Sequence, residues 1–247
     1  MPERGVVYVH PFAEEMNKAR RMAALQCVRL AAAGYAVLQI DLFGCGDSAG
    51  GIADARWSIW KDDVRAALEW LRQRGTAAIT LWGLRLGATL AADVTRDSGA
   101  GIEQLVMWQP VVNGEQYLTQ FLRLQLAAEM LSAGASQSGV GELRAALARG
   151  ESLEIAGYEL HPELALAIEG LKLMEILPAV RRVHWLEVTA QPEPRISPAS
   201  QRVLEAWRTT DFAVHAAAVS GEPFWSTLEI TECPALLDAT DAAMSRR

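Results

Sequence analysis

The stretch TLWGLRLGATLAA, residues 80–92, decides the fold of this chain. An apolar run enters it as a strand and reaches Gly83, and a helix of small residues leaves it from Gly87. The five residues G-L-R-L-G have the spacing of the G-x-S-x-G nucleophile elbow, a sharp turn between a strand and a helix. The central residue is a serine in that motif and Arg85 here. The stretch therefore predicts an elbow with a cation in place of the nucleophile.

Both glycines follow from the geometry of such a turn. The central residue adopts a strained positive φ, so the residues two places before and after it must be small to avoid the strand and helix backbones. The next residue, Leu86, stands at a helix N-terminus, where unpaired N–H groups and the helix dipole favour an anion. An anion-binding turn is thus predicted even without a nucleophile.

Strands and helices alternate on both sides of the elbow. Each expected strand is almost wholly apolar, which is typical of a parallel sheet covered by helices on both faces. We therefore predict an α/β protein with a mostly parallel sheet of about six strands. The expected strands are GVVYVH (5–10), the run beginning YAVLQID at residue 35, AAITLWG (77–83), IEQLVMWQP (102–110), VHWLEVTA (183–190) and DFAVHAAAV (211–219).

The alternation breaks after Pro110. Residues from about 114 to 178 have helical periodicity and no convincing strand, which predicts an all-helical lid inserted between strands. We therefore expect a core of residues 1–112 and 179–247, with the lid at 113–178. A last amphipathic helix is expected from about residue 225.

This order of elements resembles the α/β-hydrolase fold from its third strand to its final helix, so the initial antiparallel strand pair of that fold is expected to be absent. The quoted motifs carry the resemblance. They are HPFAEEMN (10–17), DLFGCGDS (41–48), WGLRLG (82–87) and TAQPEPRISPAS (189–200). The resemblance implies that the amides of Phe12 and Leu86 form an oxyanion hole and that Glu193 holds the position of the triad acid.

A narrower likeness comes from four segments taken together. They look like the exosortase A system-associated hydrolase 2 family, bacterial proteins encoded beside exopolysaccharide and protein-sorting genes. The segments are PFAEEMNKARRM (11–22), GCGDSAG (44–50), WQPVVNGEQYLTQFLRL (108–124) and GEPFW (221–225). The resemblance implies a hydrolase of esters or thioesters.

Two triad positions depart from that expectation. Arg85 cannot act as a nucleophile, because its guanidinium stays protonated and only donates hydrogen bonds. The histidine should follow the last strand, where the chain instead has Glu222 and its neighbours. His215 lies earlier, inside that strand, and is expected to pack in the core. His10, at the end of the first strand, is either a hydrogen-bonded strand-end residue or catalytic. We therefore expect a degenerate triad.

Arg85 has two possible roles. A fixed cation at a helix N-terminus is a good receptor for a carboxylate or phosphate. Alternatively it pairs internally with Glu14, Glu15, Asp47 or Glu222, because a buried arginine needs such a partner. The two roles can coexist, since an acidic partner would orient the guanidinium.

The function expected from the residues is therefore binding of an anionic or acyl-bearing small molecule, or of a partner. The alternative is an active ester or thioester hydrolase with a nonstandard nucleophile, or with water activated by Glu222, Glu193 or His10. Cys45, between two glycines, is a further possible nucleophile, although no histidine is predicted beside it.

The composition of the chain limits which binding partners, cofactors and cellular locations are expected. The chain has 247 residues and a net charge of -7 with no basic stripe, which argues against nucleic-acid binding. An odd, scattered set of three cysteines predicts neither a disulfide framework nor a metal site and suits a reducing cytosol. No signal peptide or membrane span is apparent, so we expect a cytoplasmic protein without cofactor or metal. An uncovered sheet edge would favour a homodimer or protein partner.

Overall fold

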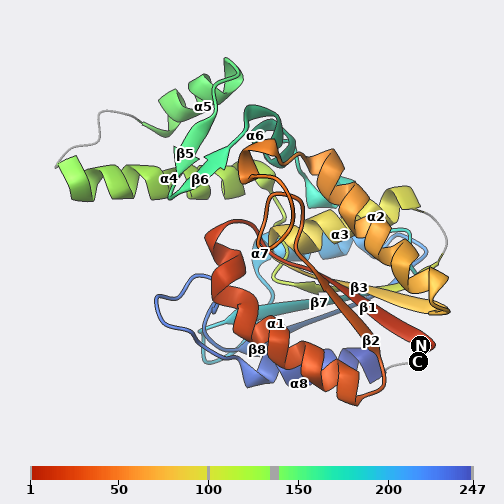
Figure 1. Ribbon diagram of the computed structural model, residues 1–247. Coiled ribbons are helices and arrows are strands. Elements are labelled where there is room, and N and C mark those ends of the chain that lie inside the picture. Colours follow the sequence, from red (N-terminus) through yellow and green to blue (C-terminus); the bar gives the residue numbers. More distant parts are fainter. Residues whose placement is uncertain (1, 99–100, 134–138, 246–247) are drawn as a thin grey trace. The chain divides into compact units, whose positions relative to one another are not determined.

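The computed structural model describes residues 2–98, 101–133 and 139–245 and divides the chain into two compact units (Figure 1). The larger unit consists of Met1–Ile40, Lys61–Val112 and Leu173–Arg247. The smaller unit consists of Asp41–Trp60 and Asn113–Lys172. The smaller unit therefore contains a second segment in addition to the insertion expected from the sequence.

A six-stranded sheet forms the centre of the larger unit, and every pairing between its strands is parallel (Figure 1). The strand order is β2-β1-β3-β4-β7-β8. The strands are β1 (Arg4–Val9), β2 (Ala36–Ile40), β3 (Ala78–Leu84), β4 (Ile102–Trp108), β7 (Arg182–Thr189) and β8 (Ala213–Ser220). This confirms the predicted sheet, and it places the carboxyl ends of β1, β3 and β4 side by side.

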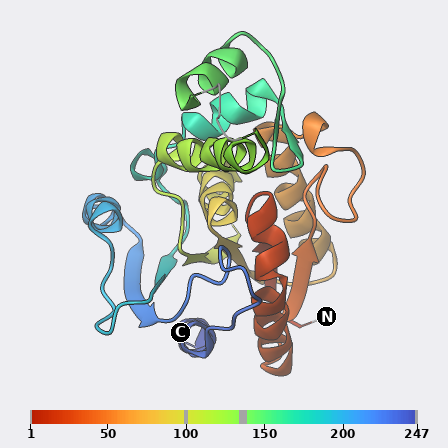
Figure 2. The ribbon, with the colours of Figure 1, turned by 90° about the vertical axis from the view of Figure 1, so that its left-hand side faces the viewer.

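Helices cover both faces of this sheet (Figures 1 and 2). On one face α1 and α8 pack against each other and against the strands, and on the other face α3 packs against β1, β3 and β4. The inner strands are buried on both sides, which is why their sequences are almost wholly apolar. The helices of this unit are α1 (Glu14–Ala32), α2 (Trp57–Gln73), whose first turn belongs to the smaller unit, α3 (Leu86–Ser98), η2 (Leu173–Glu175), α7 (Pro198–Trp207) and α8 (Pro234–Ser245).

A row of aromatic rings fills the core beneath α1 and α8. The ring centroids of Tyr8 and Trp82 lie 4.3 Å apart, those of Trp82 and Trp108 4.6 Å, and those of Trp108 and Phe224 6.1 Å. The Trp108 indole N–H donates to Thr240 Oγ1 at 2.9 Å, so its polar atom is satisfied although the residue is fully buried. Large interlocked rings of this kind make the sheet a rigid support for the turns at its ends.

The smaller unit is not all-helical, contrary to the sequence-based expectation. It contains α4 (Gly114–Ala133), α5 (Val140–Ala148), α6 (Pro162–Glu169) and η1 (Ile52–Asp54), together with an antiparallel hairpin of β5 (Leu153–Ile155) and β6 (Tyr158–Leu160). Ala156 and Gly157 form the turn of this hairpin with φ of 50° and 85°. A two-residue hairpin turn of this type requires two positive φ values. The first turn residue is alanine and not the usual asparagine, so the sequence pattern did not indicate a hairpin.

Contacts within the smaller unit explain why residues 41–60 belong to it. Arg56 Nε donates to Glu163 Oε2 of α6 at 2.9 Å, and η1 packs against β6. The glycine-rich loop DLFGCGDS is closed on itself, because the Asp47 N–H donates to Asp41 Oδ2 at 2.9 Å. This segment is therefore tied to the insertion although 52 residues separate the two segments in the chain.

The last helix begins later than expected. The sequence indicated a helix from about residue 225, but α8 starts at Pro234. Turns occupy the intervening segment, where the Ser226 N–H donates to the Pro223 carbonyl at 2.8 Å and Thr227 Oγ1 donates to the Glu229 carbonyl at 2.8 Å. Side-chain hydrogen bonds of this type compete with helix formation. None of the described helices is both long and apolar enough to span a bilayer.

Candidate functional site

Arg85 is the single residue between β3 and α3, and its φ is 55°. Its N–H donates to the Trp108 carbonyl at 2.9 Å, and its own carbonyl accepts from the Ala88 N–H at 3.1 Å. The turn is thus fixed to the neighbouring strand on one side and to the first turn of the helix on the other. A side chain at this position projects from the carboxyl end of the sheet.

The two glycines permit this turn by allowing close backbone approach. A Cβ on Gly83 would lie 2.5 Å from the Cα of Ala88, and a Cβ on Gly87 would lie 2.2 Å from the carbonyl oxygen of His10. Real Cβ atoms do not come so near to backbone atoms. The end of β1 therefore lies directly against the start of α3.

The Arg85 guanidinium is held inside the larger unit. Its Nε donates to Glu15 Oε1 at 3.0 Å, and its Nη1 donates to the Gln109 carbonyl at 3.4 Å. The face of the Trp225 ring lies beside it, with 5.6 Å from the guanidinium carbon to the ring centroid. The Arg85 side chain is 17% exposed and that of Glu15 is 11% exposed. Of the four acids considered from the sequence, Glu15 forms this pair.

Gln109 was missed in the sequence, although it joins the site to two strands. It follows β4 with a φ of 43°, and its N–H donates to the Leu186 carbonyl of β7 at 2.8 Å. Its side-chain Oε1 accepts from the Val188 N–H at 2.8 Å. These bonds fix the carbonyl that Arg85 contacts. A polar residue directly after a buried strand was the signal that could have found it.

His10 and Phe12 lie on the loop after β1. His10 is buried, and its Nδ1 lies 2.7 Å from the Pro11 carbonyl. A carbonyl only accepts, so Nδ1 carries a proton. Phe12 is also buried, and α1 begins two residues later. Leu86 is the first residue of α3, and its N–H belongs to the first four of the helix, which have no partner within it.

Two other expected site residues lie at the surface. The Glu193 side chain is 79% exposed and pairs with Arg195. Glu222 is exposed, and its carbonyl accepts from the Phe224 N–H at 2.8 Å in the turn after β8. Neither position is the buried, hydrogen-bonded environment in which a triad acid orients a histidine.

A buried acid anchors the loop that carries Glu193. Glu187, on β7, accepts from the Trp185 indole N–H at 2.9 Å and from the Ser197 N–H at 2.8 Å. Ser197 caps α7, since its side chain accepts from the Ser200 N–H. Glu187 therefore has a structural role that the sequence did not indicate, and it fixes where this loop returns to the sheet.

Glu14 is a second carboxyl at the N-terminus of α1, next to the residue that pairs with Arg85. Burial raises the pKa of Glu14, a backbone hydrogen bond opposes the rise, and the neighbouring Glu15 adds to it while Lys18 lowers it. Its Oε2 is buried without a hydrogen-bond partner within the described residues. A half-buried carboxyl with a raised pKa has the properties of a proton-transfer group.

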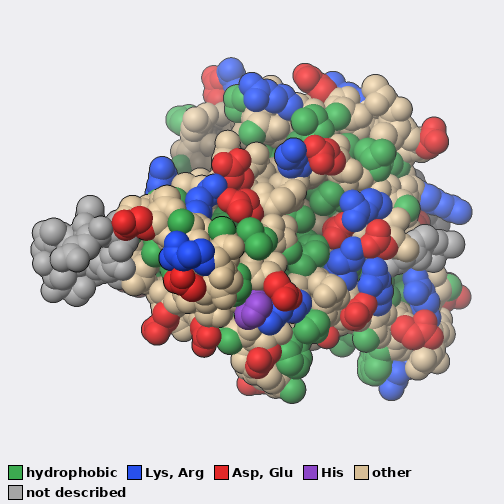
Figure 3. All heavy atoms as spheres, turned by 90° about the horizontal axis from the view of Figure 1, so that it is seen from above, with side chains coloured by type: hydrophobic (Ala, Val, Ile, Leu, Met, Phe, Trp, Pro, Cys, Tyr) green, Lys and Arg blue, Asp and Glu red, His purple; other side chains and the backbone are tan. Residues whose placement is uncertain are grey.

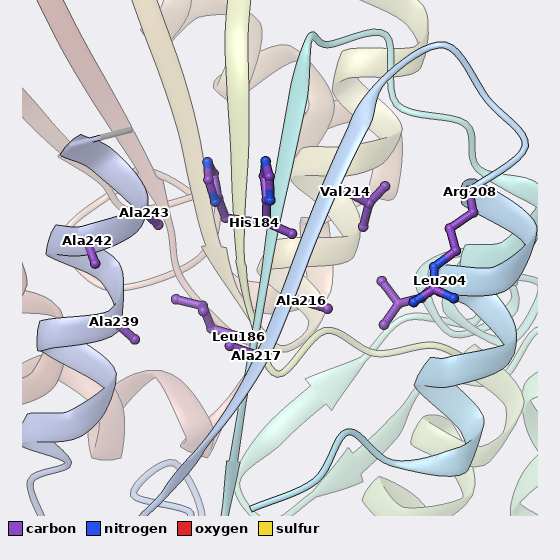
Figure 4. A pocket seen from close by; sticks show the side chains of 11 residues that line it. His184, Leu186, Leu204, Arg208, Val214, Ala216, Ala217, Ala239, Ala242 and Ala243 are labelled. Carbon is purple, nitrogen blue, oxygen red and sulfur yellow. The ribbon is translucent and has the colours of Figure 1, made fainter. Parts of the chain in front are cut away.

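The expectation that His215 packs in the core was wrong. His215 is exposed, because β8 is the edge strand, and its ring stacks on that of buried His184 with centroids 5.3 Å apart. Figure 4 shows the pocket around this edge, with a volume of about 420 Å³. Leu204 of α7 and Arg208, which follows that helix, lie on one side of β8, and alanines of α8 lie on the other.

All three cysteines are buried. Cys45 is buried and belongs to the smaller unit. Burial raises the pKa of Cys27 to about 12 and also raises the pKa of Cys233, which keeps both thiols protonated. On the face shown in Figure 3, acidic and basic side chains are interspersed.

The chain is similar to a known protein family and to several solved structures. The family model described as serine aminopeptidase, S33 (Hydrolase_4), matches residues 1–184. No curated protein matches the chain.

Three solved structures illustrate the likeness. Est1E from Butyrivibrio proteoclasticus with ferulic acid bound has a TM-score of 0.67 at 13% identity, covering 98% of this chain and 89% of that one. A thermostable carboxyl esterase from Bacillus coagulans in complex with glycerol has a TM-score of 0.59 at 14% identity, covering 89% and 82%. Alpha/beta hydrolase domain-containing protein 10 from mouse has a TM-score of 0.56 at 16% identity, covering 97% and 89%. These likenesses confirm the expected α/β-hydrolase fold.

Proposed function

We propose that this chain, which belongs to the serine aminopeptidase (S33) family of α/β-hydrolases, binds an anionic or acyl-bearing small molecule at its elbow and has a degenerate catalytic triad. One observation carries the proposal. The elbow keeps the positive φ and the close backbone packing of a nucleophile turn, but its central residue is Arg85, ion-paired with Glu15.

The other two triad positions support degeneracy. The turn after β8 has Glu222 and Pro223 where a histidine would stand, and neither is a good base for a serine. The expected acid, Glu193, is exposed and bound to Arg195. A triad needs a base within hydrogen-bond reach of the nucleophile and an acid within hydrogen-bond reach of that base, and these residue types provide neither contact.

Electrostatics at the elbow favour an anion. The N-termini of α1 and α3 meet there, because the end of β1 lies against Gly87. Each helix N-terminus has the partial positive charge of its dipole and outward N–H groups. Glu15 neutralises much of the Arg85 charge and holds the guanidinium in one orientation. The proposed ligand contacts are therefore the Leu86 and Phe12 amides, with Arg85 positioned beside them.

Aromatic residues beside the guanidinium suit an acyl or aromatic group next to the anion. Trp225 lies against the guanidinium, and Phe12 lies on the loop that precedes α1. The proposed setting is the bacterial exopolysaccharide and protein-sorting system, which rests on the sequence resemblance alone. If the ligand is a protein partner, we propose that it presents the anionic or acyl group to the same site.

A second candidate function is hydrolysis of an ester or thioester by activated water. Two observations favour it: the buried His10 ring with its Nδ1 proton fixed on the Pro11 carbonyl, and the raised pKa of Glu14. Either group would serve as a general base if a water and the bound ester lay within hydrogen-bond distance of it. Glu193 and Glu222 are weaker candidates because both are exposed.

The test compares hexanoate with hexanol by isothermal titration calorimetry. Wild type should bind hexanoate about tenfold or more tightly than hexanol, since a charge-assisted contact is worth that much. Arg85→Met should abolish this preference. Arg149→Met removes an exposed arginine of the smaller unit and should leave both affinities unchanged.

Hydrolysis is tested on the same proteins with p-nitrophenyl hexanoate and a fluorophosphonate probe. The proposal expects neither turnover nor serine labelling. Turnover that is lost in His10→Ala or Glu14→Gln would establish the second candidate. Stoichiometric labelling of any serine would overturn both.

A further inference from the structure

A hollow of about 700 Å³ lies at the amino ends of the central strands. Its lining includes Arg4 at the start of β1, Ala78 at the start of β3 and Arg182 at the start of β7. Arg85 follows the opposite end of β3, about 20 Å away at roughly 3.3 Å per residue. The hollow is thus separate from the elbow, and its volume is in the range of small-molecule sites.

A row of polar side chains crosses the sheet at this hollow. Thr80, Gln104 and Arg182 are register partners on β3, β4 and β7, so their side chains lie on one face of three adjacent strands. Thr80 is 3% exposed and Gln104 is 5% exposed. Strands covered on both faces are usually apolar, because a buried polar group is unfavourable unless it is hydrogen-bonded. Buried polar side chains in such a row therefore indicate that they have a polar partner or a function.

Gln104 is only half satisfied. Its Nε2 donates to Thr80 Oγ1 at 3.1 Å and lies 3.3 Å from Met244 Sδ. Its Oε1 is buried and accepts no hydrogen bond from the part of the chain that the structure describes. Gln104 lines the hollow, so the missing donor is one that a ligand can bring.

Arg181 provides a charge at the same place. It is exposed, and it lines this hollow and two adjoining ones of about 620 and 330 Å³. Its backbone is fixed, since its N–H donates to the Glu103 carbonyl at 3.2 Å and its carbonyl accepts from Ala213 at 3.0 Å. Arg182 pairs with the Glu103 carboxylate at 2.8 Å, whereas the Arg181 guanidinium has no ion pair within the described residues.

The opposite wall is already ordered. Arg4 Nη1 donates to the Tyr35 hydroxyl at 2.8 Å, and that hydroxyl donates to the Met244 carbonyl at 2.9 Å. The Arg4 guanidinium also lies over the Tyr35 ring, 4.2 Å from its centroid. This chain of contacts links β1, the residue directly before β2, and α8, so the wall needs no rearrangement to meet a ligand.

We propose that this amino-edge pocket, formed by Arg4, Tyr35, Thr80, Gln104, Arg181 and Arg182, binds a small anion that also carries a hydroxyl or amine donor. The carboxylate or phosphate contacts the Arg181 guanidinium, and the donor reaches Gln104 Oε1. Arg181 and Gln104 both line this hollow, so one small ligand bound there can contact both side chains. Glu3 and Glu103 also line the pocket, which disfavours a polyanion.

The test is a set of matched NMR titrations of ¹⁵N-labelled protein with glycolate, acetate and ethylene glycol. Glycolate differs from acetate by one hydroxyl and from ethylene glycol by its charge. We expect glycolate to shift the Gln104 side-chain amide and to bind about tenfold more tightly than either analogue. The same comparison is made for a phosphate by titrating glycerol phosphate and inorganic phosphate. Whichever of glycolate and glycerol phosphate binds more tightly identifies the anionic group of the ligand.

Variants assign the two contacts. Arg181→Ala should weaken glycolate about tenfold, and Arg208→Ala, which removes an arginine lining the separate pocket beside β8, should change nothing. Gln104→Met keeps the side-chain length and should make glycolate and acetate equal; Arg181→Ala provides the test if that variant fails to fold. Equal binding of acetate and glycolate by wild type, or unchanged binding by Arg181→Ala, would overturn the proposal.

Discussion

Removing the Arg85 guanidinium should destabilise the protein by leaving the Glu15 carboxylate without its ion-pair partner. The two side chains are 17% and 11% exposed, so water screens the remaining charge only in part. Breaking a buried pair from one side costs about 3–5 kcal/mol, and the partial exposure here places the expected loss for Arg85→Met at about 2–3 kcal/mol. For a chain of this size that corresponds to a fall in melting temperature of roughly 4–12 °C.

The assay is urea unfolding followed by tryptophan fluorescence, with calorimetry for the melting temperature. Arg85→Met combined with Glu15→Leu should recover most of the loss, because replacing both members of a buried pair by apolar residues is close to neutral. Arg149→Met breaks an exposed pair with Glu151 and should leave the stability close to that of wild type. The reasoning is refuted if the single variant unfolds like wild type, or if the double variant is no more stable than the single one.

Three further predictions concern the elbow and the helix beside it. Arg85→Ser alone should leave p-nitrophenyl acetate turnover at the wild-type level, because no histidine follows β8 to act as the base of a serine, and adding Glu222→His should give a small gain. A burst from the single variant would show that another group, such as His10, acts as the base. Gly87→Ala should cost about 3 kcal/mol in urea unfolding, since its Cβ would lie 2.2 Å from the carbonyl oxygen of His10, which follows β1. Gly141→Ala, which has open space in α5, should be neutral or stabilising. Glu14→Gln should be more stable than wild type near pH 7. Burial raises the folded-state pKa of Glu14 above its ordinary value of about 4.5. The contribution of Glu14 to the free energy of unfolding is therefore favourable below pH 4.5 and is lost as the pH rises through the raised pKa. An equal advantage of the variant near pH 4 would contradict this.

Local patterns were sufficient to predict most of the larger unit. The apolar runs that became β1, β3, β4 and β7 alternate with amphipathic helices, and a strand buried on both faces has few other solutions. The elbow was predictable for a similar reason. The requirement for Gly83 and Gly87 comes from atoms within a few residues of the turn and from one neighbouring strand.

The smaller unit shows where local patterns fail. The β5–β6 hairpin depends on positive φ at Ala156 as well as at Gly157, and alanine gives no sign of it. The expected helix from residue 225 is instead a series of turns held by side-chain hydrogen bonds until Pro234. In both places the sequence pattern predicted a helical period for apolar residues that lie in strands or turns. Turn-forming hydrogen bonds and backbone conformations decided the local structure there, and the hydrophobic pattern did not.

By itself, the sequence determined that a sharp turn follows a buried strand and that a cation stands at its centre. The tertiary structure decided what that cation does. Four acids were equally available along the chain, and Glu15 became the partner because β1 and β3 are neighbours and α1 begins just after β1. The same strand order left His215 at an open edge and brought Thr80, Gln104 and Arg182 into one row. Pairing between strands depends on contacts between residues that are distant in the chain, and neither propensity nor periodicity encodes those contacts.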